Sequence, residues 1–451
     1  MKTDLICRKA AVMPVLSRCS RVAIALCALM GSIATAHAEI SVSSADRRAQ
    51  APGVAVTDDG TVHVVWFDKG AVGEADQKGE MIKGSHHSHQ AFADLHYANW
   101  ALGSDGFSAS QRLNAEPGQV WGFSISRPII AADGAGRVHV MFPGNAKSPE
   151  TGKSVASTFY THSEDGGNRF SAPVQLNADP EEDLSALIMG GLAQAQVFGG
   201  MAVSPEGTVH AFWLDTRGMT ESMRSAVYYR RSENGGAQFG DEVRLLENAQ
   251  CPCCQVSALA ENERSLFLSA RQIHGDNIRT PMLFHSEDGG ASFGEPVATG
   301  GTPWRLEGCP LKLTALAATG SAVHTLVHNG AEEPPGLLYA RADLSGTAFE
   351  APIKMHPEAV ISDSPAMASS GEVLLAVWHA KAPAQRQIYY RFSLDGGATF
   401  LPVQHLPTGD ASVGYPSVAA TPENDFVIAW QADEVIQVTR IAPPTQALAN
   451  R

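Results

Sequence analysis

A turn motif repeated four times constrains the fold of this chain more than any other feature. Ser-x-Asp-Gly-Gly-x-x-Phe occurs at residues 163–170, 286–293 and 393–400, and residues 232–239 carry it with Asn234 in place of the Asp. Ser and Asp side chains hydrogen-bond nearby backbone amides and glycines accept positive φ, so each copy predicts a tight turn. Each copy lies between two strand-like runs, which is the pattern of a β-hairpin. We expect the Phe to pack between the strands of its own hairpin.

A second repeat, a strand of the form Gly-x-Val-His-Val-x-Trp, alternates with the turns. Its copies lie at residues 60–68, 136–143, 207–215, 264–271, 322–329, 371–379 and 425–431. Seven such strands predict an all-β fold, a seven-bladed β-propeller of four-stranded antiparallel blades, with six or eight blades as alternatives. The last blade lacks a fourth strand, which we expect Ile40–Ser43 to supply, closing the ring and protecting its edges. The recurring histidines of these strands are expected to be structural.

The two ends of the chain are expected to lie outside the propeller. A basic leader, an apolar run at residues 22–34 and the sequence Ala36-His37-Ala38 predict a signal peptide over residues 1–38. Residues 39–443 are predicted to form the single propeller domain, with a C-terminal tail at 444–451. We therefore expect a periplasmic or secreted protein with no membrane span after the signal is cleaved.

Charge excludes one class of partner. Residues 1–38 carry five of the 33 Lys and Arg residues and one of the 47 Asp and Glu residues, so the remaining chain has a formal net charge of −18. Such a surface repels phosphate backbones, and we expect no nucleic-acid binding.

The order of strands in a blade decides where a site can lie. Successive strands are antiparallel, so loops between second and third strands share one face with the links between blades, and the turn motifs lie on the other. Long insertions on one face of a rigid scaffold usually carry binding or catalysis. We call the first of these faces the ligand face and expect function there.

Four cysteines remain after the leader is removed, and all lie in two successive links of the ligand face. They are Cys251, Cys253, Cys254 and Cys309. One interpretation is two disulfides, typical of an oxidising compartment. A second is a thiolate site for a copper or zinc ion, and a third is a redox pair formed by Cys251 and Cys254.

Other ligand-face candidates surround these links. They are Arg271, Asp276 and Arg279 in the fourth blade, and Trp304 and Arg305 in the link that ends at Cys309. A separate loop contains His86, His87 and His89, which form a second candidate transition-metal site or a solvated loop.

Both repeats resemble those of the sialidase superfamily, whose bacterial neuraminidase repeats carry the same turn, known there as the Asp-box. The segment Cys251-Pro252-Cys253-Cys254 is similar to one in a bacterial sialidase-like subgroup. The resemblance covers nearly the whole chain after the leader and implies the fold more than the reaction.

The resemblance also implies where catalysis would lie if this chain had it. Sialidases use three arginines for the substrate carboxylate, a Tyr nucleophile with a partner Glu, and an Asp acid/base. Weak candidates for these roles are Tyr415, Arg127, Arg271, Arg279, Asp68 and Asp215. The usual Arg-Ile-Pro opening is absent, and no spacing joins these residues into one catalytic set.

Three hypotheses follow from the sequence. The first is an exported sialidase-like propeller that binds a metal or glycan on the ligand face without catalysis. The second is a glycoside hydrolase of the exo-sialidase type that acts on extracellular glycans. The third is a scaffold for other proteins of the cell envelope.

Overall fold

The computed structural model describes residues 39–71, 92–147, 154–178, 196–217, 224–333, 335–356, 361–381 and 385–444. The predicted signal peptide, His86, His87, His89 and nearly all of the predicted tail lie outside the described residues. Residues Ala36–Pro443 belong to one compact unit. No helix within the described residues has the length and apolar character needed to cross a membrane.

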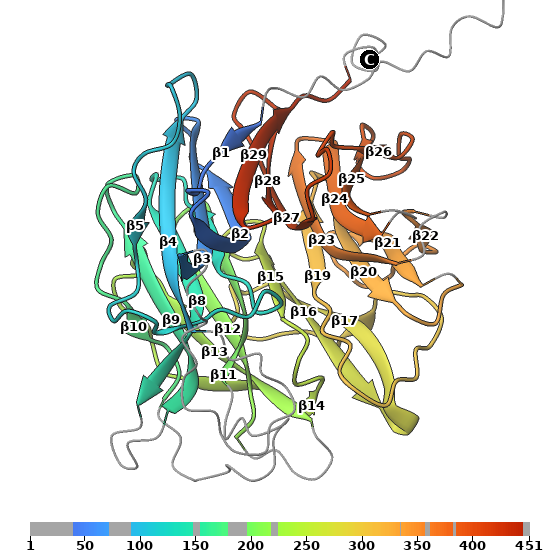
Figure 1. Ribbon diagram of the computed structural model, residues 1–451. Helices are drawn as coiled ribbons and strands as arrows, with labels where there is room; N and C mark the ends of the chain where they lie inside the picture. Colours follow the sequence, from blue (N-terminus) through green and yellow to red (C-terminus); the bar gives the residue numbers. More distant parts are fainter. Residues whose placement is uncertain are drawn as a thin grey trace, which may run out of the picture. The chain divides into compact units, whose positions relative to one another are not determined.

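The described chain is all-β and consists of antiparallel strands in five sheets (Figure 1). A nine-stranded sheet contains two four-stranded sets. The first set is β2 (Arg47–Val56), β3 (Thr61–Ala71), β4 (Phe92–Ala101) and β5 (Gln111–Arg112). The second is β7 (Ile129–Ala132), β8 (Val138–Lys147), β9 (Ser154–Ser163) and β10 (Val174–Gln175), and β6 (Val120–Trp121) bridges the two sets.

An eight-stranded sheet is built in the same way from the next two sets. One is β11 (Gln196–Val203), β12 (Val209–Asp215), β13 (Ser225–Ser232) and β14 (Val243–Gln250). The other is β15 (Ser257–Ala260), β16 (Leu266–His274), β17 (Ile278–Ser286) and β18 (Val297–Ala298), with a 3-10 turn, η1 (Gly275–Asn277), between β16 and β17. Gln250 of β14 pairs with Gln272 of β16 and joins the two sets.

Three four-stranded sheets complete the described chain. The first is β19 (Thr314–Ala318), β20 (Ala322–Asn329), β21 (Gly336–Asp343) and β22 (Ile353–Lys354). The second is β23 (Ser362–Ser370), β24 (Val373–Lys381), β25 (Arg386–Ser393) and β26 (Gln404–His405). The third is β27 (Val413–Ala420), β28 (Phe426–Ala432), β29 (Val435–Ile441) and β1 (Ile40–Ser41).

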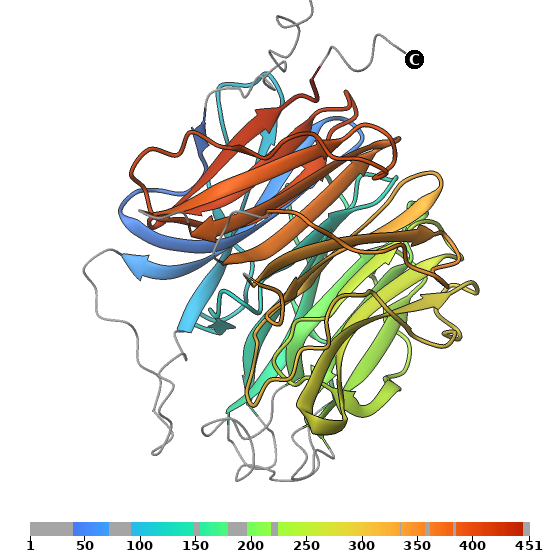
Figure 2. The same ribbon diagram turned by 90° about the vertical axis from the view of Figure 1, so that its right-hand side faces the viewer.

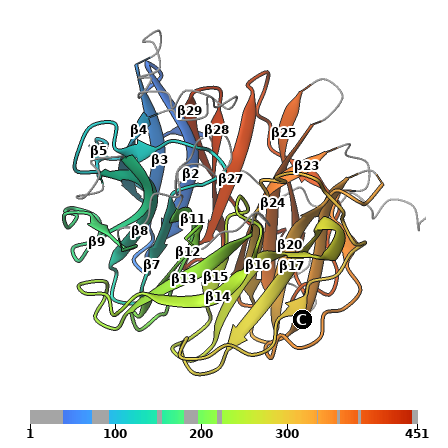
Figure 3. The same ribbon diagram turned by 90° about the horizontal axis from the view of Figure 1, so that it is seen from below.

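The first strands of these sets contact one another in a closed series. The order of contact is β2, β7, β11, β15, β19, β23, β27 and again β2. Figure 3 shows the sheets arranged around a common centre. Segments far apart in the sequence therefore meet where these first strands begin.

The N-terminal strand lies in the same sheet as the C-terminal strands. Ile40 of β1 pairs with Val438 of β29, and Ser41 pairs with Gln437. Figure 2 shows the blue N-terminal strands beside the red C-terminal ones. This pairing gives the last sheet its fourth strand and covers one edge of β29.

The four repeated turns share one hydrogen-bond pattern. In the first, the Gly167 amide donates to the Ser163 hydroxyl at 2.9 Å, and the Arg169 amide donates to the Asp165 carboxylate at 2.8 Å. Ser232 and Asn234, Ser286 and Asp288, and Ser393 and Asp395 make the equivalent bonds. Side chains thus satisfy the backbone amides of each turn.

The Phe of each turn packs against the preceding four-stranded set rather than within its own hairpin, which corrects our expectation. The Phe170 ring packs edge-on against Tyr97 of the preceding set, with 4.8 Å between ring centroids, and Phe239 and Phe400 pack in the same way on Tyr160 and Tyr339. Each of these three tyrosines, and Tyr229 in the same way, hydrogen-bonds the repeated histidine of its own sheet at 2.7 Å. The pairs are His63–Tyr97, His139–Tyr160, His210–Tyr229 and His324–Tyr339.

Candidate functional site

Three cysteines lie together between β14 and β15. Cys251, Cys253 and Cys254 are 1%, 0% and 2% exposed. The Sγ atoms of Cys251 and Cys254 are 3.4 Å apart, and those of Cys251 and Cys253 are 3.7 Å apart. All three Sγ atoms lie within 4.8 Å of one another. We call these three residues the cysteine cluster.

Backbone hydrogen bonds on both sides fix the chain that carries the cluster. The Cys251 amide donates to the carbonyl of Arg271 in β16 at 2.7 Å. The Val256 amide donates to the carbonyl of Phe198 in β11 at 3.0 Å. The cluster is therefore held between the two four-stranded sets of the eight-stranded sheet, and Phe198 belongs to the same buried apolar core as the cysteines.

Two arginines place positive charge beside the cluster. Arg271 is 5% exposed, and its Nη2 donates to the His328 carbonyl at 3.1 Å while its guanidinium lies 5.6 Å from the centre of the Trp304 ring. Arg279 is also buried, and its Nε and Nη2 each donate to the Leu306 carbonyl at 3.4 Å. The charge of Arg271 acts on Cys254, and that of Arg279 acts on Cys251.

Ionisation is unevenly distributed among the cluster thiols. Burial opposes ionisation of Cys254, but hydrogen bonds with the Cys251 and Cys253 thiols, together with Arg271, hold the pKa of Cys254 well below its usual value. The pKa of Cys253 lies well above its usual value, because hydrogen bonds with Cys251, Cys254 and Cys309 favour the thiol. The surroundings therefore favour ionisation of Cys254 over ionisation of Cys253.

The fourth cysteine joins this group from the next link. Cys309 is exposed, yet its sulfur accepts a hydrogen bond from the Cys253 thiol, which lowers the pKa of Cys309. Cys251, Arg271 and Cys309 thus lie in one neighbourhood, although they come from three segments of the chain.

The spacing of the sulfur atoms fits a metal ion better than an existing covalent bond. No disulfide bond joins any of these four cysteines in the structure, and the 3.4 Å between the Cys251 and Cys254 sulfurs exceeds a disulfide bond length of about 2.05 Å. Three sulfurs around one ion at about 2.3 Å are separated by about 3.8 to 4.0 Å. The two sulfur distances of 3.4 and 3.7 Å are close to this spacing.

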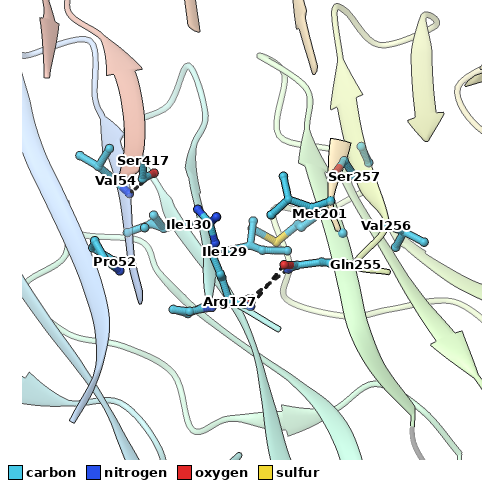
Figure 4. Close-up of a pocket in the computed structure, with 15 residues that line it drawn as sticks. Pro52, Val54, Arg127, Ile129, Ile130, Met201, Gln255, Val256, Ser257 and Ser417 are labelled. Atoms are coloured by element: carbon cyan, nitrogen blue, oxygen red, sulfur yellow. Dashed lines mark hydrogen bonds between the residues drawn. The ribbon is translucent and has the colours of Figure 1, made fainter. Parts of the chain in front are cut away.

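A cavity of about 190 Å³ lies where the first strands of several sheets face one another. Its lining includes Gly53, Arg127, Met201, Gln255 and Ser417 (Figure 4). Gln255 directly follows the cysteine cluster, and its side chain donates to the carbonyls of Arg127 and Gly199 at 3.2 and 3.0 Å. The segment that carries the cluster therefore continues directly into one wall of the cavity.

Arg127 is the charged side chain of this cavity. It is 9% exposed, its Nη1 donates to the Pro416 carbonyl at 3.0 Å, and its Nε has no hydrogen-bond partner among the described residues. Burial lowers the pKa of Arg127 to about 10, while Asp363 and Tyr415 favour its charged form. The guanidinium is thus cationic at neutral pH and retains an unused donor, which suits an anion.

Further charged groups, not foreseen from the sequence, lie around Arg127. Lys312 and Asp363 form a half-buried ion pair. The Tyr415 amide donates to Nδ1 of His379 at 3.1 Å, and burial lowers the pKa of His379 to about 3. One sequence signal marks this region: the pairs Ala51-Pro52, Arg127-Pro128, Ser364-Pro365 and Tyr415-Pro416 recur at the start of first strands or just before them.

The structure divides the remaining sequence candidates into separate groups. Tyr415 lies with Arg127, whose guanidinium is 5.6 Å from the Tyr415 ring centre. Asp68 is buried and pairs with Arg47 at 2.5 Å. Asp215 is fully buried, and Arg217 binds both of its carboxylate oxygens at 3.0 Å from Nε. Each aspartate is thus neutralised by an arginine of its own.

Asp276 and Arg305 lie at the edge of the cluster's surroundings. Asp276 is exposed in the tight turn η1, with a φ of 57°. Arg305 forms a backbone bridge with Ile278, and its exposed guanidinium lies 3.5 Å from Glu307. Arg305 therefore joins the link that carries Cys309 to β17, and Asp276 precedes Asn277, whose carbonyl accepts from the Leu306 amide of that link.

Comparison with known proteins shows a likeness of structure at low sequence identity. No family model and no curated protein matches this sequence. A polysaccharide lyase of family PL25, an ulvan lyase, matches with 13% identity and a TM-score of 0.54, over 87% of this chain and 94% of that chain. The BP39L lectin from Burkholderia pseudomallei matches with 9% identity and a TM-score of 0.51, over 86% and 97%.

The chain has a β-propeller fold. This follows from the likeness together with the closed series of sheets. A Hadza microbial sialidase, Hz136, also matches, with 12% identity and a TM-score of 0.48 over 93% of this chain and 98% of that chain. Identities this low establish the fold of this propeller alone and leave its chemistry to its own residues.

Proposed function

We propose that this chain is an exported seven-bladed β-propeller that binds one thiophilic metal ion, copper(I) or zinc, at the cysteine cluster. The observation that carries the proposal is the set of three buried sulfur atoms within 4.8 Å of one another. The closed order of first strands supports seven blades, and the sequence supports removal of residues 1–38, a domain over 39–443 and a periplasmic or secreted location.

The surroundings of the cluster support an ion rather than three permanent thiols. Thiolates are the preferred ligands of Cu(I) and common ligands of Zn²⁺. Cys251, Cys253 and Cys254 would hold the ion, which would replace the protons now shared between them. Arg271 and Arg279 offset the negative charge of the thiolates in a buried site, where an uncompensated charge is costly.

Anaerobic titration of the reduced, metal-free protein tests the proposal. We expect one equivalent of Cu(I) or Zn²⁺ to bind with release of protons, and Cys251→Ser and Cys254→Ser to abolish tight binding. Met141→Leu alters a buried sulfur in a different core region and serves as the matched control, which keeps full binding. Absence of uptake by the reduced wild-type protein would contradict the proposal and favour the disulfide interpretation.

A second candidate function, binding of an acidic glycan in the central cavity, is favoured by Arg127. Arg127 lines the cavity, its Nε has no hydrogen-bond partner among the described residues, and guanidinium groups bind carboxylates and sulfates well. The PL25 lyase has also been solved bound to -[GlcA(1-4)Rha3S]-, an acidic saccharide. For this chain we expect binding of a glucuronate-containing oligosaccharide that Arg127→Met weakens about tenfold or more.

The same cavity allows the hydrolase hypothesis to be tested directly. Turnover of a fluorogenic sialoside that disappears in Tyr415→Phe would support a glycoside hydrolase of the exo-sialidase type.

Binding of the acidic oligosaccharide is measured separately from turnover, by calorimetry with the wild-type protein and Arg127→Met. Equal affinity of the two proteins for the acidic oligosaccharide would show that Arg127 does not bind it.

A further inference from the structure

Cys309 differs from the three cluster cysteines in its exposure. The cluster sulfurs lie in the core, whereas Cys309 is open to solvent. A hydrogen bond with Cys253 nevertheless places the Cys309 sulfur against the cluster. The group of four sulfurs thus has three buried members and one member that faces solvent.

The link before Cys309 is fixed, and the residue next to Cys309 has space around it. The Arg279 amide donates to the Trp304 carbonyl at 2.8 Å, and the Leu306 amide donates to the Asn277 carbonyl at 3.1 Å. Gly308 has a φ of 152°, and no atom lies within 4 Å of the place where a side chain would begin. Cys309 therefore follows a residue with open space beside it.

Charge balance favours a monovalent ion held by the three buried sulfurs. Cu(I) with three thiolates carries a charge of −2, which the cations Arg271 and Arg279 offset. Zn²⁺ reaches the same charge only with a fourth thiolate, which would make Cys309 a permanent ligand. The burial of three sulfurs and the exposure of the fourth match the first arrangement.

We infer that Cys309 is the exchange ligand through which Cu(I) passes between a Cu(I)–thiolate donor in solution and the cysteine cluster. This inference rests on the proposed function. The Cys309 thiolate bonds to the ion while the donor thiolate leaves, and the ion then moves to Cys251, Cys253 and Cys254. Copper stays in the +1 state throughout, and the protons of the cluster thiols pass to solvent.

The test compares rates with equilibrium binding. Reduced, metal-free protein is mixed anaerobically with Cu(I)–glutathione, and a coloured Cu(I) chelator then measures removal of the ion. We expect wild type, Cys309→Ser and Cys309→Ala to bind one Cu(I) with similar affinity, while loading and removal slow about tenfold or more in the two Cys309 variants. Glu307→Gln changes an exposed residue of the same link and is expected to leave both rates unchanged.

Each other outcome has a distinct meaning. Unchanged rates in both Cys309 variants would overturn the exchange role. A large loss of equilibrium affinity in these variants would also overturn it, because Cys309 would then be a permanent ligand. Failure of the wild-type protein to take up Cu(I) would instead contradict the proposed function itself.

Discussion

At the scale of single residues, Asp215 illustrates a buried charge that stabilises the fold. Its carboxylate is bound by Arg217 and accepts a hydrogen bond from Trp213 Nε1 at 3.3 Å, and burial raises the pKa of Asp215 against the effect of Arg217. Asp215→Ala leaves Arg217 with Glu242 as its remaining carboxylate partner. We expect the free energy of unfolding in urea to fall by about 2 to 3 kcal/mol.

An exposed ion pair provides the control for Asp215. Arg305 and Glu307 are 67% and 66% exposed, so Glu307→Gln is expected to change the free energy of unfolding by less than about 0.5 kcal/mol. Similar losses in the two variants would show that the Asp215 carboxylate does not act as a buried partner.

The sequence predicted some site residues and missed others for a physical reason. Cys251, Arg271 and Cys309 were placed on one face because strand direction alone decides which ends of a blade meet. Lys312 and Asp363 come from different blades, and only closure of the ring brings them beside Arg127. A residue whose role depends on such closure leaves no local motif in the chain.

At the scale of elements, the repeated turn connects neighbouring sheets. Gly236 has a φ of 86°, and a β carbon at this position would overlap the Tyr160 hydroxyl of the preceding sheet. Gly236→Ala therefore combines an unfavourable φ with a steric clash, and we expect a loss of about 2 to 4 kcal/mol in unfolding free energy.

A substitution at Gly136 separates the effect of the unfavourable φ from that of the steric clash. Its φ is 77°, and no atom lies within 4 Å of its β position, so Gly136→Ala is expected to cost only about 1 kcal/mol. Equal losses for Gly136→Ala and Gly236→Ala, measured by urea unfolding, would argue against the contact between sheets.

The histidine–tyrosine pairs predict a dependence of stability on pH. Burial lowers the pKa of His63, His210 and His324 to about 4, whereas an unfolded histidine has a pKa of about 6.5. Between pH 4 and pH 6.5, these histidines are therefore protonated in the unfolded chain and neutral in the folded chain. Stability is therefore fully present above pH 6.5 and decreases as the pH falls toward 4, on the order of 3 kcal/mol per histidine.

Urea unfolding at several pH values measures this effect. The midpoint is expected to fall steeply between about pH 6.5 and 4.5, and His210→Gln should reduce the slope by removing one titrating group. A midpoint that stays constant between pH 7 and 5 would contradict the assignment of these histidines as buried and neutral.

At the scale of the whole molecule, repetition made the fold predictable. The turn and strand motifs recur along the chain, so each copy supports the same local structure and together they imply a ring. The partner of each turn was not predictable, because a contact such as that of Phe239 with Tyr160 joins two sheets and no sequence signal marks their proximity.

Function was less predictable than fold because the site occurs once and the scaffold is repeated. The cysteine cluster interrupts the repeat in one link, and its spacing alone leaves disulfide, metal and redox chemistry open. The structure adds three observations that bear on this choice: the burial of the three sulfurs, their mutual distances, and the adjacent Arg271 and Arg279.

X-ray absorption on the reduced, metal-loaded protein tests the central claim most directly, since it reports the atoms bound to the ion. With one ion per chain, we expect a first shell of sulfur neighbours, at about 2.3 Å if the ion is zinc, that is lost in Cys254→Ser. A shell made only of nitrogen or oxygen, or a protein that retains no ion, would contradict a thiolate site at Cys251, Cys253 and Cys254.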